Sequence, residues 1–452
     1  MAGLSLTLAT AKSTLMNTQV QMQVTSNNIA NAENTSYARQ KAVLTTNLSI
    51  QTHAGWLGTG ASVDSIIQMR DGYIEQSLLN SMSGESQYNT LTTQLTIAQA
   101  SFSDDGSTGI SQALGDFWDA WDTLVQNPEG ITEQAVVYSA TESLVQDIRA
   151  TYDDLDALAN TQLPEQMEGT TDEANSLLEQ IAELNLQIMR NESSGYSANN
   201  LRDTRYQALK DLAEIVPIKF SQETNGSVTV SFSENGTSVT LVSGAQTNAT
   251  PLQYNDGTGE VTFTAYDGGT TLTTDTVSGG ELGGLMTAQD DIQDYMERLN
   301  EFTSTLIEQV NGIYNPTSDP AEPFVFTGSD AGDIAMSADF LDGLNSSELS
   351  DRALLISNLQ DQEVSFTSST TRFSDYLADI QSQIGSDIED AETKVDYYEA
   401  LRSELESQQQ SVSGVSLDEE MVDLLKHQQV YQAAAKIINT TVEMLNTILD
   451  IS

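Results

Sequence analysis

The chain of 452 residues contains no cysteine, which excludes disulfides, thiolate catalysis and zinc sites built on thiolates. Aromatic residues make up only 6% and hydrophobic residues 38%, which favours long helices and small β-modules over one large globule. No basic cluster followed by an apolar run opens the sequence, so no cleaved signal peptide is visible. No stretch approaches the ~20 apolar residues that span a bilayer, so we expect no membrane insertion. A cytoplasmic protein and a protein exported without a cleaved signal fit equally well.

Basic residues are also scarce: 17 stand against 66 acidic ones, for a net charge of −49. Such a surface repels nucleic acid and anionic membranes, so neither is expected as a partner. Residues 1–63 carry a net +2 and residues 411–452 a net −4, which leaves 12 basic and 59 acidic groups in between. Near-neutral ends indicate packing against other subunits, with the charged middle facing water. Chance patterning together with a saline habitat, which favours acidic surfaces, is the alternative interpretation.

The first segment has the spacing of a helix with a coiled-coil seam. Apolar and small residues alternate at steps of four and three, a 3.5-residue period. The seam positions are Leu4, Leu8, Ala11, Leu15, Thr18, Met22, Thr25 and Ile29. Turn-forming residues at 31–35 end the pattern.

The last segment mirrors the first. Ser416 and Glu419 form a capping-box pattern that predicts a helix start. The same spacing then continues through Met421, Leu424, Gln428, Tyr431, Ala435, Ile438, Val442, Leu445 and Leu449. Two antiparallel helices of an ordinary bundle would give this pattern too. However, the seam is narrow, and helices with so little apolar surface are marginal alone, so we expect mobile ends until a partner covers them.

Between the ends the sequence predicts a mainly α protein with an inserted β-domain. Helical periodicity covers residues 64–102, 110–127, 131–162 and 366–410. From about 216 to 278 the pattern alternates, with Asn225-Gly226 and Asn235-Gly236 as hairpin signals. The expected division is a terminal coiled-coil assembly domain (1–50 with 412–452), a helical shell domain (51–215 with 282–411, irregular at 315–351) and a small antiparallel β-domain (216–281).

Residues that could carry catalysis are few. The two histidines, His53 and His427, lie far apart and lack metal-binding spacing, so packing or solvation explains them better than a ligand role. The glycines at 279–284 do not form a dinucleotide-binding pattern. The cluster of Phe117, Trp118 and Trp121 is most simply helix core. We therefore expect no enzyme, no cofactor and no metal.

Both ends resemble a known group of proteins. The run containing Asn27, Asn28, Ile29, Ala30 and Asn31, followed by Tyr37 and Arg39, is similar to the N-terminal signature of flagellar rod, hook and hook-associated proteins. That group usually has Thr-Pro-Gly before the Tyr, where this chain has residues 34–36 as Asn-Thr-Ser. The stretches 416–421 and 428–436 resemble the C-terminal signature of the same group, and are the more specific match.

Three inner motifs narrow the resemblance to the hook-associated protein 1 family. They are Asn-Asn-Leu-Arg-Asp-Thr-Arg at 199–205, the Asn-Gly and Leu-Val-Ser-Gly pair at 235–244, and Gly-Gly-Glu-Leu-Gly-Gly-Leu at 279–285. The likeness covers nearly the whole chain in order. The chain is shorter than many members of that family, so one outer domain is expected to be reduced or missing.

The resemblance implies a structural, extracellular component of the flagellum, exported through the flagellar type III apparatus. It implies copies in a helical ring, hook protein below, a second hook-associated protein above, and an export chaperone on the C-terminal helix. The implied mechanism is ordering of the mobile ends when they dock on neighbouring subunits. Two alternatives stay open: another axial protein such as a filament subunit, and an enzyme or calcium-dependent adhesin in the β-domain.

Overall fold

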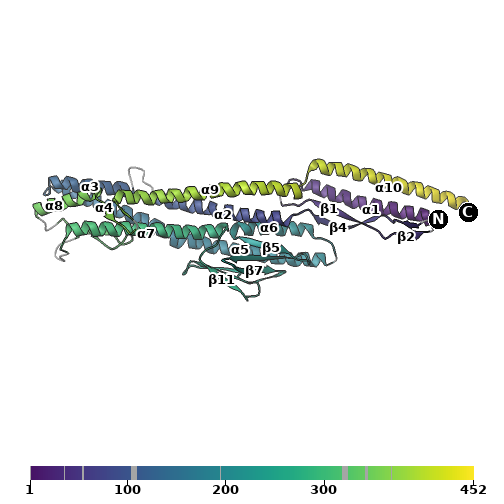
Figure 1. Ribbon diagram of the computed structural model, residues 1–452, viewed down its shortest axis with the longest axis horizontal. Coiled ribbons are helices and arrows are strands. Elements are labelled where there is room, and N and C mark those ends of the chain that lie inside the picture. Colours follow the sequence, from purple (N-terminus) through teal and green to yellow (C-terminus); the bar gives the residue numbers. More distant parts are fainter. Residues whose placement is uncertain are drawn as a thin grey trace.

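The chain forms a long, narrow molecule with both termini at one end (Figure 1). The computed structural model describes residues 2–34, 36–52, 55–102, 109–193, 195–317, 324–338, 340–341, 345–367 and 369–451. Helices dominate, as the sequence predicts. They are α1 (Ala2–Ala30), α2 (Gly72–Ser101), α3 (Ile110–Gln126), α4 (Ile131–Ala157), α5 (Leu163–Glu192), α6 (Asn199–Ile215), α7 (Gly280–Tyr314), α8 (Ser346–Ser357), α9 (Phe373–Ser413) and α10 (Leu417–Ile451).

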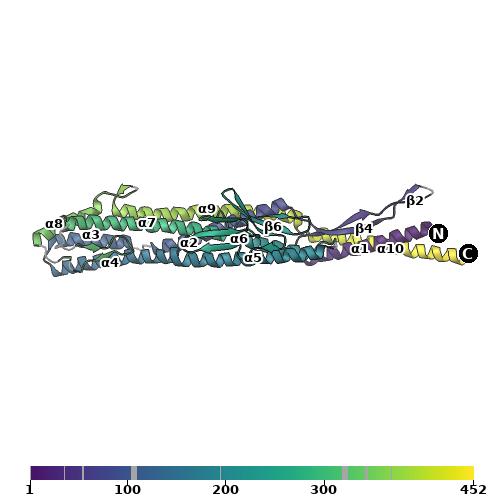
Figure 2. The same ribbon diagram turned by 90° about the horizontal axis from the view of Figure 1, so that it is seen from below.

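The terminal unit consists of α1, α10 and a long hairpin. α1 and α10 pack side by side in opposite directions, and the hairpin lies on α1 (Figures 1 and 2). Its strands β1 (Gln40–Thr46) and β4 (Ala61–Gln68) pair antiparallel from Gln40↔Gln68 to Thr46↔Ala61. Towards its tip, β2 (Ile50–Thr52) pairs with β3 (Gly55–Leu57).

This hairpin corrects the prediction of a helix that begins at residue 64. Residues 61–68 are strand, and α2 begins only at Gly72. Asp71 caps that helix, because its carboxylate accepts hydrogen bonds from the backbone N–H groups of Tyr73 (2.9 Å) and Ile74 (3.3 Å). The apolar residues at 66–67 fit a helical face and a strand face equally well, so periodicity alone could not separate them.

The body is a helical bundle in which α2, α7 and α9 lie parallel to the long axis of the molecule (Figure 1). A π-helical turn (Leu158–Gln162) continues α4 into α5, whereas the sequence predicts a helix that ends at 162. Trp121 and Phe117 are fully buried and pack edge to face at 6.1 Å, so the predicted aromatic core is confirmed.

The predicted inserted β region is confirmed, and its strands lie between Ile218 and Thr274. One sheet has the order β5 (Ile218–Gln222), β6 (Val228–Glu234), β7 (Thr237–Ser243), β8 (Gln246–Thr247), and the other β11 (Thr271–Thr274), β10 (Glu260–Thr264), β9 (Leu252–Asn255). Asn235 and Gly236 both have positive φ (49° and 80°), as the turn between β6 and β7 requires. Phe232 and Phe263 stack at 3.7 Å between the sheets.

The stretch predicted to be irregular, 315–351, holds short elements. Strands β12 (Phe326–Thr327) and β13 (Ala335–Met336) pair, and a capping box between Asn345 and Glu348 begins α8. A further short hairpin, β14 (Val364–Ser365) with β15 (Thr370–Thr371), precedes α9, and a 3₁₀ turn (Asn358–Asp361) follows α8.

Asparagines on helices hold many of the strands in place. Each one offers its side-chain amide to the backbone of a strand, where it satisfies an N–H and a C=O that the sheet leaves unpaired. The pairs are Asn17 with Ala61 and Val63, Asn28 with Gln40, Asn175 with Leu252, Asn185 with Val228, and Asn311 with Val325 and Phe326.

Candidate functional site

The N-terminal signature centres on Asn28, whose side chain is 1% exposed at the end of α1. Its amide nitrogen donates to the backbone oxygen of Gln40 (2.9 Å) and to Glu420 Oε2 (3.1 Å). Its Oδ1 accepts from the backbone N–H of Gln40 (3.0 Å) and from the hydroxyl of Tyr37 (2.7 Å). All four bonding positions of this amide are therefore used, which fixes α1, β1 and α10 relative to one another.

Glu420, at the start of α10, brings the C-terminal signature into the same network. Its carboxylate is buried and pairs with Arg39 Nε at 2.7 Å, while Arg39 Nη1 reaches the exposed Glu419 at 3.0 Å. Burying a carboxylate costs several kcal/mol unless it is paired and hydrogen-bonded, and Glu420 has both kinds of partner. Burial, with the nearby Asp203 and Glu420 carboxylates, raises the pKa of Tyr37, so its hydroxyl stays a hydrogen-bond donor.

A second polar cluster joins the hairpin to the body. Arg70, just after β4, pairs with Glu75 on α2 and with Asp203 on α6, each at 2.6 Å. Burial raises the pKa of both carboxyl groups, and the ion pairs with Arg70 only partly oppose it. The Gln68 side chain also donates to Asp203 at 2.7 Å. The base of the hairpin is thus tied to two helices by charge and hydrogen bonding.

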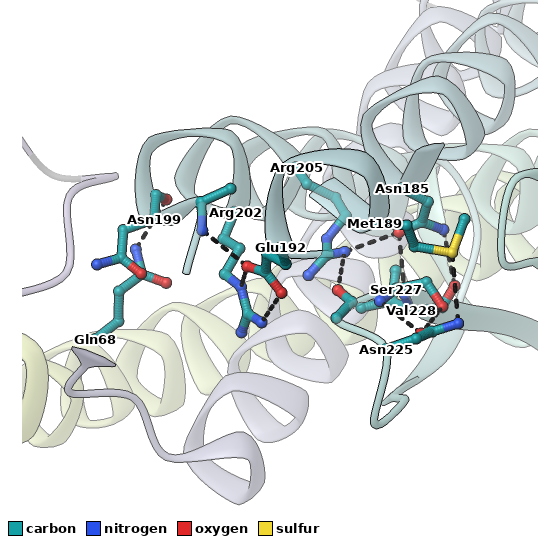
Figure 3. A network of polar contacts seen from close by, with 12 residues as sticks. Gln68, Asn185, Met189, Glu192, Asn199, Arg202, Arg205, Asn225, Ser227 and Val228 are labelled. Atoms are coloured by element: carbon teal, nitrogen blue, oxygen red, sulfur yellow. Dashed lines mark hydrogen bonds and ion pairs between the residues drawn. The ribbon is translucent and has the colours of Figure 1, made fainter. Parts of the chain in front are cut away.

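The motif at 199–205 continues this cluster into the β-domain (Figure 3). Arg202 makes a two-pronged ion pair with Glu192, with both N–O distances 2.7 Å. Arg205, only 4% exposed, donates to Asn185 Oδ1 and to the backbone oxygen of Gly226, both at 2.8 Å. Burial, with the neighbouring Arg202, lowers the pKa of Arg205 to about 10. The motif therefore fastens α6 to α5 and to the first β-turn.

Other signature residues play smaller parts. Asn27 donates to the Tyr37 hydroxyl at 3.3 Å, and Asn31 bonds back to the Asn27 backbone oxygen at 2.9 Å. Ile29 is half-buried, and Ala30 is exposed as the last residue of α1. His427 lines a hollow with Arg39 and Asp423, while His53 lies outside the described residues.

The predicted seam is only partly the one that packs α10 on α1. On α1 the predicted Leu4, Leu8, Leu15 and Met22 are half-buried, and Ala11, Thr18 and Thr25 are buried. On α10, Leu424, Tyr431, Ala435, Ile438 and Leu445 are half-buried, and the side chain of Leu449 lies outside the described residues.

Three α10 positions correct that prediction, because Met421 and Val442 are 54% and 41% exposed and Gln428 is exposed as well. The residues one place before the first two, Glu420 and Thr441, are buried instead, at 2% and 4% exposure. The physical reason is the Asn28–Glu420–Arg39 network, which needs Glu420 inside and so sets the rotation of α10. Hydrophobic spacing cannot find a seam position occupied by a carboxylate.

The part of the chain that the structure describes holds no group of His, Asp and Glu side chains arranged to bind a metal ion. None of its helices is long and apolar enough to cross a membrane. The network of Asn28, Glu420 and Arg39 serves to position helices. Its paired charges and fully hydrogen-bonded amide hold α1 and α10 in place.

Comparisons with known proteins point the same way. The model of the flagellar hook-associated protein FlgK helical domain matches residues 95–319. The flagella basal body rod protein model matches residues 8–36, and the C-terminal model of the flagellar basal body rod FlgEFG proteins matches 407–451. The two terminal matches contain Asn28 and Glu420, the pair that joins the ends.

Similar proteins cover the chain almost completely. Flagellar hook-associated protein 1 of Bacillus subtilis is 24% identical over 98% of this chain and 97% of its own length. The proteins of the same name from Escherichia coli and Salmonella typhimurium are each 23% identical over 98% of this chain, and over 98% and 99% of their own lengths. A solved structure of the flagellar hook junction protein FlgK from Burkholderia pseudomallei has a TM-score of 0.48 and 20% identity, over 56% of this chain and 46% of that one. The chain therefore resembles flagellar hook-associated protein 1 along nearly its whole length, and residues 95–319 match the FlgK helical domain.

Proposed function

We propose that this chain is a structural component of the bacterial flagellum at the junction between hook and filament. The observation that carries the proposal is the Asn28–Glu420–Arg39 network, which makes one unit of the two ends of the chain. A junction protein needs such a unit, because its two ends must bind neighbouring subunits together. The names of the full-length relatives support the same role.

The proposed assembly domain, residues 1–50 with 412–452, holds most of the terminal unit, whose hairpin continues to Gln68. None of the described residues of α1 or α10 belongs to the main core of the body, which runs from Leu79 to Ala391. Packing on the body therefore contributes little to the ordering of the two ends. Ordering costs about 1–2 kcal/mol per residue, and burial against neighbouring subunits offsets it. Residues 51–215 with 282–411 form the shell around the assembly domain, and the β-domain, 216–281, faces outward.

The proposed partners are copies of the chain in a helical ring, hook protein below and a second hook-associated protein above. Before assembly, an export chaperone covers α10, whose residues Met421, Val442 and Met444 are exposed in the single chain. Export proceeds through the flagellar type III apparatus, and the protein functions outside the cell. The resemblance to hook-associated proteins and the exposed apolar surface of α10 support these proposed partners.

Deletion of the gene in its own organism tests the role. Cells are imaged by electron microscopy, and the medium is assayed for unassembled flagellin. We expect hooks without filaments and flagellin shed into the medium. Complementation with the intact gene restores filaments and serves as the control. Normal filaments in the deletion strain would contradict a junction role and favour an accessory axial component.

A further inference from the structure

The tip of the long hairpin, defined here by Leu48, Ile50, Trp56 and Leu57, exposes apolar side chains at the same end of the molecule as both termini. Trp56 is 71% exposed and Leu48 92%. β2 and β3 pair with each other, and their end of the hairpin stands apart from α1 and α10 (Figure 2). A two-stranded hairpin is marginal in water by itself, so an exposed apolar tip indicates a contact surface.

Charge restricts what this tip can bind. Residues 44–62 contain no Asp, Glu, Lys or Arg, in a chain that has 83 charged residues and a net charge of −49. Two copies of so acidic a protein repel each other wherever their acidic faces meet. An uncharged segment at one end is the kind of surface on which copies can approach without that repulsion.

A matching surface runs along the distal half of α10. Val430, Ile437, Met444 and Ile448, here called the outer stripe, are 44%, 46%, 51% and 41% exposed. Their spacing of seven, seven and four residues places them in one line along the helix. Lys436 and Glu443 are the only charged residues in 430–448, and they balance each other.

The tip and the outer stripe lie at the same end of the molecule but do not cover each other. The hairpin packs on α1, and α10 packs on a different side of α1 (Figure 1). Each apolar surface is therefore free within one chain, near-neutral, and close in position to the other.

We propose that the hairpin tip of one copy docks on the outer stripe of α10 in a second copy. This inference rests on the proposed function, because it names the contact through which copies join. Two different surfaces meet in this contact, so it is heterologous. Every pair of copies keeps one free tip on one copy and one free outer stripe on the other. Such a contact continues from copy to copy, as a ring or helical layer requires.

The absence of cysteine allows a direct test. Three single-cysteine variants are made, Trp56→Cys, Ile437→Cys and Ile131→Cys; Ile131 begins α4 in the body and is 85% exposed. Trp56→Cys is mixed with Ile437→Cys or with Ile131→Cys, and disulfide dimers are followed by non-reducing gel. The first mixture cross-links faster by about tenfold, because docking raises the effective concentration of the two thiols. Equal rates in the two mixtures overturn the inference.

Quenching of tryptophan fluorescence gives a second readout in the unmodified chain. Trp118 and Trp121 are 2% and 0% exposed, so a soluble quencher acts mainly on Trp56. Association, followed by sedimentation in the same samples, protects Trp56 from the quencher. Association with Trp56 still quenched overturns this inference and leaves the junction role standing. No association at any concentration overturns the inference too, while the deletion experiment still decides the role.

Discussion

Asn28 and Glu420 are separated by 392 residues in the sequence, and their side chains are bonded at 3.1 Å in a buried site. Each belongs to one of the two terminal signatures, and neither signature is satisfied without the other. Asn28 needs an acceptor for its second amide hydrogen, and the buried carboxylate needs a donor beside Arg39. The signatures therefore mark one structural unit, built from both ends of the chain.

Replacing Asn28 with Leu keeps a similar volume and removes every bond of the amide. The backbone N–H and C=O of Gln40 lose their partner, at a cost of about 3 kcal/mol in the ordered terminal unit. Because ordering is coupled to assembly, the critical concentration for assembly rises by about a hundredfold. Sedimentation of assembled material measures this critical concentration. An unchanged critical concentration would show that the network is dispensable.

Glu420 and its neighbour Glu419 provide a matched pair of substitutions. Both contact Arg39, but the side chain of Glu420 is 3% exposed and that of Glu419 65%. Glu420→Gln leaves Arg39 without its buried counter-charge, which destabilises the ordered terminal unit by about 3 kcal/mol. Glu419→Gln destabilises the same terminal unit by less than about 1 kcal/mol. The critical concentrations of the two variants test this, and equal effects would refute the distinction.

The rotation of α10 about its own axis was not predictable from the sequence. The 3,4 spacing predicted the helix and the seam residues Leu424, Tyr431, Ile438 and Leu445, which are half-buried. It also predicted Met421 and Val442, which are exposed, because the structure buries Glu420 and Thr441 instead. A carboxylate in a seam becomes predictable only once its partners are known, and Asn28 and Arg39 lie at the other end of the chain.

The strands, too, include some that the sequence predicts and some that it does not. Asn-Gly turns made the β-domain predictable, because Asn235 and Gly236 adopt the positive φ that a tight turn needs. The hairpin at 40–68 carries no such turn signal, and it depends on Asn17 and Asn199 for its unpaired backbone groups. Asparagine inside a helix resembles any solvated polar residue, so these contacts are invisible in the sequence.

The body should respond to pH through Asp291 on α7. Burial and the nearby Asp387, Asp294 and Asp290 carboxylates raise the pKa of Asp291 from 3.8 to about 6. A raised carboxyl pKa means that the charged form destabilises the fold. Stability is therefore lost as pH rises from about 4 through about 6, and the cost is fully present above that range.

Asp291→Asn removes this cost. The variant should be more stable by about 1 kcal/mol near pH 7.5, a value reduced for solvent screening of a partly exposed group. The gain should vanish near pH 3.5, where the carboxyl is protonated in both states. Calorimetric unfolding of the body at both pH values measures this, with the exposed Asp119→Asn as control. A gain that persists at low pH would show that charge is not the cause.

Charges placed in the α1–α10 seam should abolish assembly. Ile438 and Leu445 are half-buried there, and changing both to Asp puts carboxylates between the helices. The body should stay folded, since its core holds no described residue of α10. Gln432→Asp, at an exposed position of the same helix, should still assemble. Circular dichroism and sedimentation separate folding from assembly, and normal assembly of the double variant would refute the seam.

Amide hydrogen exchange tests the central claim, that the two ends order against neighbouring subunits, most directly. In dilute monomer we expect residues 1–40 and 416–452 to exchange much faster than the buried helices of the body, because the ends share no core with them. In assembled material the same segments should become protected, while exchange in the body changes little. Strong protection of both ends in dilute monomer would contradict ordering by assembly.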